Sequence, residues 1–144
     1  MAKEAPTHSI SVAGVVIDAD SRVLVIQRRD NGHWEPPGGI LELGETLEQG
    51  VQREVMEETG VHVTVNGLTG VYKNMNRGIV ALVYRCSVAA GHPRPSSEST
   101  SVRWVDRDQI DVLMSPAYAT RVQDAFSTTV ASRAHDRVNL IDPS

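Results

Sequence analysis

Three glutamates and one arginine lie close together in the segment Arg53-Glu54-Val55-Met56-Glu57-Glu58. If this segment is helical, successive residues turn by about 100°, and Glu58 points close to the direction of the apolar residues Leu47 and Val51. Its carboxylate is therefore expected at the buried edge of the helix. Because an unpaired buried carboxylate is costly, the pattern predicts a positively charged partner for this side chain.

Two further penalties fall on the same turn. Glu54 and Glu58 are four residues apart, a like-charge spacing that destabilises a helix by about 0.2–0.5 kcal/mol. Glu57 and Glu58 also lie toward the negative end of the helix dipole. A solvated acidic face is the usual interpretation of a glutamate-rich helix, but several violated rules at one place are typical of a functional site. A hard divalent cation that takes oxygen ligands, Mg²⁺ or Mn²⁺, would remove all three penalties.

Arg53 precedes these glutamates and stands four residues before Glu57. It either orients one of the carboxylates through a charge-assisted hydrogen bond or forms an ordinary surface pair. The helix that carries these residues is expected from Thr46 to Thr59, because Thr46 and Gln49 form a capping-box pair and Gly60 suits a left-handed C-terminal position. The preceding segment, Arg28 to Gly39, is rich in charge, glycine and proline and predicts a long functional loop.

The remaining segments predict an α/β (α+β) fold with a mixed β-sheet that has helices on both faces. Residues Ile10 to Ile17 and Arg22 to Gln27 predict a hairpin around Asp18-Ala19-Asp20-Ser21. Further strands are expected at Val61 to Val65, Val71 to Lys73, Ile79 to Ala89 and Ser101 to Val105. Ser115-Pro116 predicts the start of a second helix. Residues 134–144 are expected to be a frayed tail.

Composition limits the classes of function. The 144 residues fit one domain, and 40% hydrophobic with 22% charged residues predicts a folded core. A net charge of −4 argues against bulk nucleic acid as a partner. Cys86 has no second cysteine for an internal disulfide, residues Met1 to Ser9 lack the apolar stretch of a secretion signal, and no apolar run suits a membrane helix. We therefore expect a cytoplasmic protein with no membrane partner.

A longer pattern surrounds the acidic turn. Gly39 is followed after five residues by Glu45, and after seven more by Arg53-Glu54-Val55-Met56-Glu57-Glu58-Thr59-Gly60-Val61. This string, from Gly39 to Val61, resembles the Nudix box in every defined position. The flanks, Trp34-Glu35-Pro36-Pro37-Gly38-Gly39 and Arg103-Trp104-Val105, are also similar to the Nudix hydrolase family. The resemblance implies a Nudix fold in which a loop-helix-loop holds the metal.

The resemblance also implies roles for individual residues. Glu54, Glu57 and Glu58 match the metal-binding glutamates, and the Gly39 carbonyl is a further expected ligand. Arg53 matches the arginine that orients the catalytic helix, and Glu45 matches a structural glutamate. For the general base, Glu54, Glu58 and the loop residue Glu98 remain alternatives. Gly50 departs from the alanine common in relatives, which is expected to cost the helix about 0.5–1 kcal/mol.

Outside the box, the candidate residues have weaker support. One of Arg28 and Arg29 is expected to contact a phosphate, because guanidinium groups bind phosphate at two points. Trp34 either stacks on a nucleobase of the substrate or packs beneath the glycine loop. Trp104 is expected in the core. No role is assigned to His33, His62, His92 and His135.

Together with these features, the resemblance implies a Mg²⁺-dependent enzyme that cleaves the diphosphate linkage of a nucleoside di- or triphosphate by attack of water at phosphorus. ADP-ribose or a nucleoside diphosphate sugar is the alternative substrate, although no proline occurs between Val61 and Gly91, where relatives that use ADP-ribose often have one. A non-catalytic domain that senses nucleotides is the alternative from another class. The resemblance also allows a homodimer.

Overall fold

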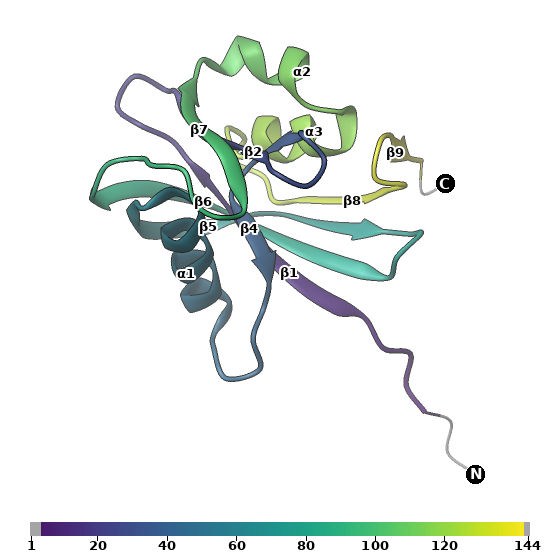
Figure 1. The fold of residues 1–144 in the computed structure, drawn as a ribbon. Coiled ribbons are helices and arrows are strands. Elements are labelled where there is room, and N and C mark those ends of the chain that lie inside the picture. Colours follow the sequence, from purple (N-terminus) through teal and green to yellow (C-terminus); the bar gives the residue numbers. More distant parts are fainter. Residues whose placement is uncertain (1–3, 143–144) are drawn as a thin grey trace.

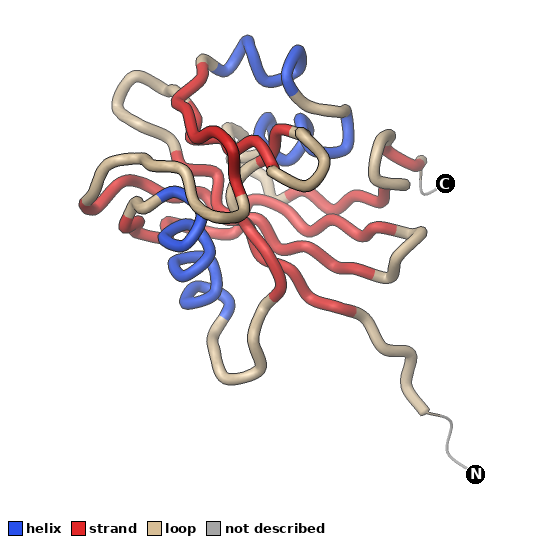
Figure 2. Tube along the Cα trace, in the orientation of Figure 1, coloured by secondary structure: helices blue, strands red, loops and turns tan. Residues whose placement is uncertain are grey.

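The computed structural model describes residues 4–142, in which β-strands are the most abundant regular structure. The strands are β1 (Ser9–Val16), β2 (Val23–Arg28), β3 (Trp34–Glu35), β4 (Gly38–Ile40), β5 (His62–Asn74), β6 (Ile79–Ala90), β7 (Ser99–Val105), β8 (Ala131–His135) and β9 (Leu140–Ile141). The helices are α1 (Leu47–Thr59), α2 (Ile110–Leu113) and α3 (Pro116–Asp124), with a 3-10 turn η1 (Arg107–Gln109) before α2. Figure 2 shows how the strands cross the middle of the molecule between the helices.

The strands form two sheets. The larger sheet has the order β4-β1-β6-β5-β8-β9, and β3, β2 and β7 form the smaller one. The pairs β1–β6 and β5–β8 are parallel, whereas the other pairs are antiparallel. The larger sheet is therefore mixed, as the sequence predicts.

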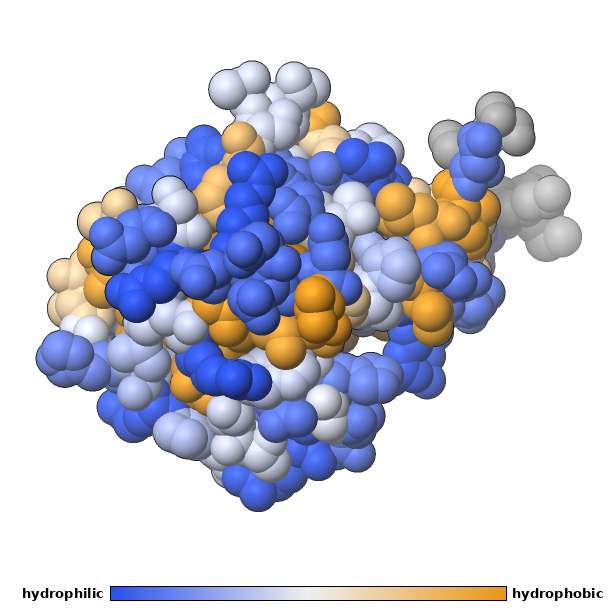
Figure 3. Space-filling model, turned by 90° about the horizontal axis from the view of Figure 1, so that it is seen from above, coloured by the Kyte–Doolittle hydropathy of each residue, from blue (hydrophilic) through white to orange (hydrophobic). Residues whose placement is uncertain are grey.

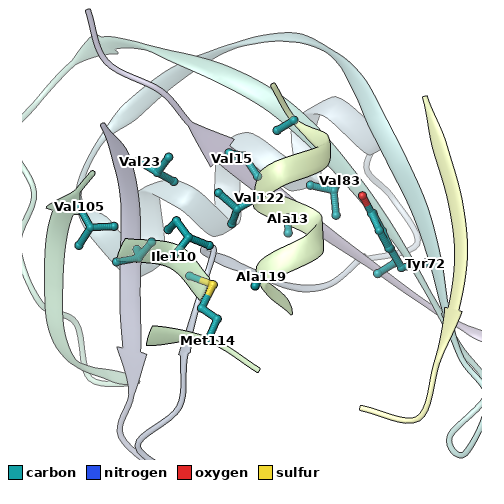
Figure 4. Packing of buried hydrophobic residues seen from close by; sticks show 13 residues of the cluster. Ala13, Val15, Val23, Tyr72, Val83, Val105, Ile110, Met114, Ala119 and Val122 are labelled. Atoms are coloured by element: carbon teal, nitrogen blue, oxygen red, sulfur yellow. The ribbon is translucent and has the colours of Figure 1, made fainter. Parts of the chain in front are cut away.

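The larger sheet lies between α1 on one face and α2 and α3 on the other (Figure 1). Side chains of β1 alternate between these two faces, as strand geometry requires. Val12 and Val16 belong to the cluster that contains Val51 of α1, and Ala13 and Val15 belong to the cluster beneath α3. Figure 4 shows the second cluster, in which the α3 side chains reach toward the sheet. The predicted arrangement of a mixed sheet between helices is confirmed.

Helix α1 begins and ends where its capping residues predict. The Thr46 hydroxyl accepts a hydrogen bond from Gln49 N at 3.1 Å, and Gln49 Oε1 accepts one from Thr46 N at 2.9 Å. Gly60, with φ of 77°, ends the helix in the left-handed conformation and donates its N–H to Met56 O. A methyl group at Gly14 would lie 2.9 Å from a Val55 methyl carbon, so the glycine lets α1 approach β1 closely.

The predicted hairpin of residues 10–17 and 22–27 is wrong. β1 pairs with β4 and β6 in the larger sheet, whereas β2 pairs with β3 and β7 in the smaller one. A single antiparallel bridge, Ile17 to Val23, joins the segments. Both strands are apolar on both faces, so their sequences do not distinguish pairing with each other from pairing with distant strands.

Three other expectations need correction. The loop predicted from Arg28 to Gly39 contains β3 and the start of β4, and the separate strands predicted at residues 61–65 and 71–73 are one bulged strand, β5. The predicted tail begins too early, because β8 extends to His135 and pairs in parallel with β5, and β9 follows it. His135 is 1% exposed. Residues 143–144 of the predicted tail lie outside the described range.

The surface viewed from the α2–α3 side is largely hydrophilic, with separate hydrophobic patches (Figure 3). Scattered apolar patches of this kind are ordinary on a folded protein. No helix within residues 4–142 is long and apolar enough to cross a membrane.

Candidate active site on helix α1

Arg53 connects the acidic residues at the start of the site. Its Nε and Nη2 donate to the two carboxylate oxygens of Glu45, at 2.9 and 2.6 Å. Nη1 donates to Glu54 Oε1 at 2.7 Å and to Glu57 Oε2 at 3.3 Å, and Nη2 also reaches the Ile40 carbonyl. These bonds hold the pKa of Glu45 at about 2. Arg53 thus connects the loop before α1 with two of the three box glutamates.

Glu54 and Glu58 are both buried, with 7% and 4% of their surfaces exposed. Arg53 partners Glu54, but Glu58 Oε2 is fully buried and has no hydrogen-bond partner. Burial, followed by the charge of Glu54, raises the pKa of Glu58 to about 9. The position close to the apolar stripe that the sequence predicts for Glu58 is therefore correct, and the side chain lacks a positive partner within the described residues.

Gly39 lies directly against Glu54. A methyl group at Gly39 would lie 2.7 Å from the carboxyl carbon and both oxygens of Glu54, so a larger residue would push this carboxylate away. Glu57 differs from its neighbours, because 58% of its side chain is exposed. The expected metal ligands thus comprise two buried carboxylates, one exposed carboxylate and a glycine backbone beside them.

A cleft of about 500 Å³ opens beside Glu58. We call it the carboxylate cleft, and its lining residues are Ile26, Arg28, Arg29, Asp30, Glu58, Ser97 and Glu98. The structure thus brings Glu98, from the loop before β7, to the same cleft as Glu58, although the two residues lie far apart in the sequence. The Glu98 side chain is exposed, and its charge contributes to the raised pKa of Glu58.

The two candidate phosphate contacts line this cleft but already have partners. Arg28 donates to both oxygens of Asp30, at 2.9 and 2.7 Å, and to Glu35 at 3.2 Å. Arg29 donates to the carbonyls of Ser97 and Ser99. Arg28 therefore carries a largely compensated charge, whereas Arg29 has only neutral acceptors.

Neither tryptophan lines the carboxylate cleft. Trp34 is half-buried, packs against the core beneath α3, and has the Arg103 guanidinium 4.3 Å from its ring centre. Trp104 packs against the cluster that contains α1, as expected for a core residue. These contacts favour the interpretation that Trp34 packs in the protein over stacking on a nucleobase.

Several residues near the site carry no assignment from the sequence. Glu35 is one of them. Burial raises its pKa, and its carboxylate interacts electrostatically with both Arg28 and Glu58. Arg121 of α3 is another, with 8% of its surface exposed. Only its spacing in the sequence indicates that Arg121 is buried. It follows Tyr118 by three residues and therefore lies along the apolar side of the helix.

Gly50 also has a steric role that the sequence does not indicate. A methyl group there would lie 2.6 Å from Leu41 Cδ1 and 3.1 Å from Glu45 Oε1. The glycine therefore gives space to the glutamate that binds Arg53, and it is more than a weak point in the helix.

The donor set suits a hard divalent cation. Among residues 4–142, no three acidic, histidine or cysteine side chains already surround one point as a complete ligand group. Nevertheless, Glu58 Oε2 is a buried acceptor without a donor, and it lies in a pair of carboxylates that repel each other. Carboxylate and carbonyl oxygens are the ligands of Mg²⁺ and Mn²⁺, so Glu54, Glu57, Glu58 and the Gly39 carbonyl fit such an ion chemically.

Comparison with known proteins identifies the family of this chain. The NUDIX domain family matches residues 7–126. The chain is 56% identical over 137 residues to a MutT-like protein of Streptomyces ambofaciens, covering 94% of this chain and 89% of that one. It is 31% identical over 112 residues to an ADP-ribose pyrophosphatase of Methanocaldococcus jannaschii, covering 73% and 66%. The fold is similar to that of a NUDIX hydrolase from Nitrosomonas europaea, with a TM-score of 0.77, 21% identity, and coverage of 92% and 82%. The chain therefore belongs to the Nudix hydrolase family.

Proposed function

We propose that the protein is a Mg²⁺-dependent hydrolase that cleaves the diphosphate linkage of a nucleoside di- or triphosphate by attack of water at phosphorus. The observation that carries this proposal is the buried Glu58 oxygen that lacks a donor beside the buried Glu54. Because two buried carboxylates repel each other, a cation at this place stabilises the folded protein and supplies the charge that a phosphate substrate requires. Mn²⁺ has the same ligand preferences and is the expected substitute.

Glu54, Glu57 and Glu58, with the Gly39 carbonyl, would hold the ion. When bound, Mg²⁺ neutralises phosphate oxygens and lowers the pKa of a water molecule. Arg53 is a positioning residue, because its two bonds to Glu45 fix the guanidinium that orients Glu54 and Glu57. The chain thus contributes an acidic helix on which one arginine orients two of the carboxylates.

The attacking water must lose a proton to a carboxylate of the chain. Glu58 and Glu98 share the carboxylate cleft, so either can accept a proton there, and Glu54 is the third candidate. Arg29, whose guanidinium has only carbonyl acceptors, supports a phosphate contact at the cleft wall better than Arg28, whose charge is offset by Asp30 and Glu35. Trp34 is a further candidate for a substrate contact, although it does not line the carboxylate cleft.

ADP-ribose, or another nucleoside diphosphate sugar, is the second candidate substrate. The relative from Methanocaldococcus jannaschii, named as an ADP-ribose pyrophosphatase, supports it. Both substrates contain a diphosphate, so the roles of the box residues would be the same. The difference lies in the group that occupies the space beyond the phosphates.

A screen of nucleoside triphosphates, nucleoside diphosphates, ADP-ribose and nucleotide sugars with Mg²⁺ tests the proposal. Released phosphate, pyrophosphate and nucleotide products should be separated, because they identify the bond that is cut. We expect turnover of at least one substrate and none in excess EDTA. Tight nucleotide binding without any turnover would instead support the nucleotide-sensing alternative, and full turnover in EDTA would contradict a metal-dependent reaction.

A further inference from the structure

A second cavity, of about 300 Å³, lies on the α3 side of the site. We call it the α3 cavity. It extends from Gly38 and Gly39 at the start of the box to Tyr118, Arg121 and His135. An outer hollow, lined in part by Arg77 and Arg137, shares Arg28, Glu35, Asn74, Ile79 and Tyr118 with this cavity. The α3 cavity is therefore adjacent to the expected metal ligands at one end and open toward arginines at the other.

Arg121 is a buried cation in the wall of the α3 cavity. Its guanidinium carbon lies 4.6 Å from the Tyr118 ring centre and 5.2 Å from that of Tyr72. Its Nε is buried without a hydrogen-bond partner, and among residues 4–142 no carboxylate lies within ion-pair distance of it. Glu35 acts on Arg121 electrostatically, but the Glu35 carboxylate binds Arg28 at 3.2 Å. Buried charges are normally paired, so this cation lacks its counter-charge.

His135 does not supply the acceptor that the Arg121 guanidinium lacks. Its Nδ1 accepts a hydrogen bond from Arg137 N at 2.9 Å, and its Nε2 lies 3.1 Å from Arg121 Nη2. Both neighbours are donors, whereas a neutral imidazole has only one acceptor nitrogen. Burial and the adjacent Arg121 lower the pKa of His135, which favours the neutral ring. With Nδ1 accepting from Arg137 N, the ring proton lies on Nε2, and Arg121 Nη2 therefore faces a donor where it needs an acceptor.

Asn74 and two arginines add further donors around the cavity. Asn74 is 6% exposed, and its Oδ1 already accepts from Asn76 N at 3.0 Å, which leaves its amide N–H groups for a ligand. Arg77 and Arg137, at the outer hollow, form no ion pair among the described residues. Asp30 and Glu35 also line these hollows, but both already accept hydrogen bonds from Arg28. On a chain with a net charge of −4, the remaining donors and unpaired arginines indicate a ligand that is acceptor-rich and negatively charged.

We propose that the α3 cavity is a binding site for an oxyanion of the substrate, a phosphate group, held by Arg121 with His135 and Asn74. Resting on the proposed function, this assignment means that the substrate carries a phosphate beyond the linkage held by the box glutamates. The group comes either from a longer phosphate chain or from a separate phosphate on the nucleoside. Arg121 is thus a specificity-determining residue at the far end of the site.

The first test is a titration of the metal-free protein with inorganic phosphate in EDTA. The Arg121 Nε–H signal and the His135 ring nitrogens, followed by NMR, should shift with a saturable dependence on phosphate. Arg121→Gln should weaken phosphate binding at least about tenfold, because it removes charge-assisted hydrogen bonds. Arg22→Gln is the matched control, since Arg22 pairs with Asp18 in a turn outside the cavity. Its phosphate affinity should equal that of the wild type.

A second arm identifies the source of the phosphate through two matched pairs, GTP with GDP and NADPH with NADH, each competing with inorganic phosphate in EDTA. Tighter binding of GTP than GDP assigns the site to the phosphate chain, and tighter binding of NADPH than NADH assigns it to a separate phosphate. Equal binding within both pairs would overturn the substrate assignment, leaving an adventitious ion only.

Neither arm depends on turnover, so the two proposals fail separately. Phosphate shifts at Arg121 without any hydrolysis in the substrate screen would contradict the proposed function alone. Hydrolysis without phosphate shifts would contradict the α3 cavity site alone. If Arg121→Gln does not fold, the wild-type NMR titration still decides, and Arg121→Lys, which keeps the charge but loses the planar donors, should bind phosphate more weakly than the wild type.

Discussion

Arg53 binds Glu45 through two parallel contacts, Nε to Oε2 at 2.9 Å and Nη2 to Oε1 at 2.6 Å. Two-point contacts of this kind fix the plane of a guanidinium as well as its position. Since 22% of the Arg53 side chain and 12% of the Glu45 side chain are exposed, solvent screens the pair less than an ordinary surface pair. The third nitrogen, Nη1, is thereby directed at Glu54 and Glu57.

Arg53→Lys should lower kcat by about 10–100-fold, the usual effect of losing a residue that orients metal ligands. Lysine keeps the charge but cannot bind Glu45 at two points and Glu54 at the same time. Steady-state kinetics with saturating Mg²⁺, together with circular dichroism, measure the effect on a folded protein. Arg22→Lys, in an exposed pair with Asp18, serves as the control and should keep the wild-type rate. An unchanged kcat for Arg53→Lys would contradict the positioning role.

Glu58 should make the metal-free protein less stable as pH rises. Its pKa is raised to about 9 in the folded state from the ordinary value of 4.5, so folding favours the protonated form. The stability that this form contributes is complete below about pH 4.5 and is lost as pH rises toward 9. Glu58→Gln removes the titrating group, so its stability advantage over the wild type should grow across this range.

Urea unfolding in EDTA at several pH values measures this difference. Glu48→Gln, on the exposed side of α1, is the matched loss of a carboxylate and should follow the wild-type curve. Parallel curves for Glu58→Gln and the wild type would show that Glu58 is not held in a repulsive, buried environment.

Gly50→Ala should fail to stabilise the protein, although alanine in a helix interior normally contributes about 0.5–1 kcal/mol relative to glycine. The added methyl group would meet Leu41 Cδ1 at 2.6 Å and Glu45 Oε1 at 3.1 Å. Because Glu45 Oε1 accepts from Arg53, we expect a lower kcat together with an unchanged or reduced urea midpoint. A clear rise in the midpoint with full activity would show that the space around Gly50 is not needed.

The sequence predicts α1 well because its signals are local. The Thr46 and Gln49 side chains cap the helix, Gly60 ends it, and the burial of Glu58 follows from helical geometry. Pairing between strands depends on distant segments, and for this reason the sequence predicts one hairpin for β1 and β2, which belong to different sheets. The acidic half of the site could thus be predicted from one helix.

The α3 cavity could not be predicted from the sequence in the same way. Arg121 and His135 meet only because α3 and β8 pack together, fourteen positions apart in the chain. Neither residue belongs to a motif, and a histidine near the C-terminus resembles part of a polar tail. Glu35 lies in the flank from Trp34 to Gly39, but its burial and its pairing with Arg28 depend on the tertiary fold.

Glu98→Gln distinguishes between the candidates for the general base. If Glu98 accepts the proton, kcat should fall by about 10²–10⁴-fold while the affinity for Mg²⁺ stays the same. If a box glutamate accepts it, the rate should change little, because the Glu98 side chain is exposed and lies outside the predicted ligand set. Single-turnover kinetics and a Mg²⁺ titration of the same variant separate these outcomes.

Parallel measurement of Mg²⁺ affinity and kcat in the glutamine variants of Glu54, Glu57 and Glu58 tests most directly whether these residues bind a catalytic divalent cation. Each substitution keeps the side-chain shape and removes one negative charge. We expect each variant to fold, to lose Mg²⁺ affinity, and to lose at least about 10²-fold in kcat. Glu48→Gln should do none of these. Wild-type Mg²⁺ affinity and rate in all three variants, on a substrate that the wild type hydrolyses, would contradict the claim.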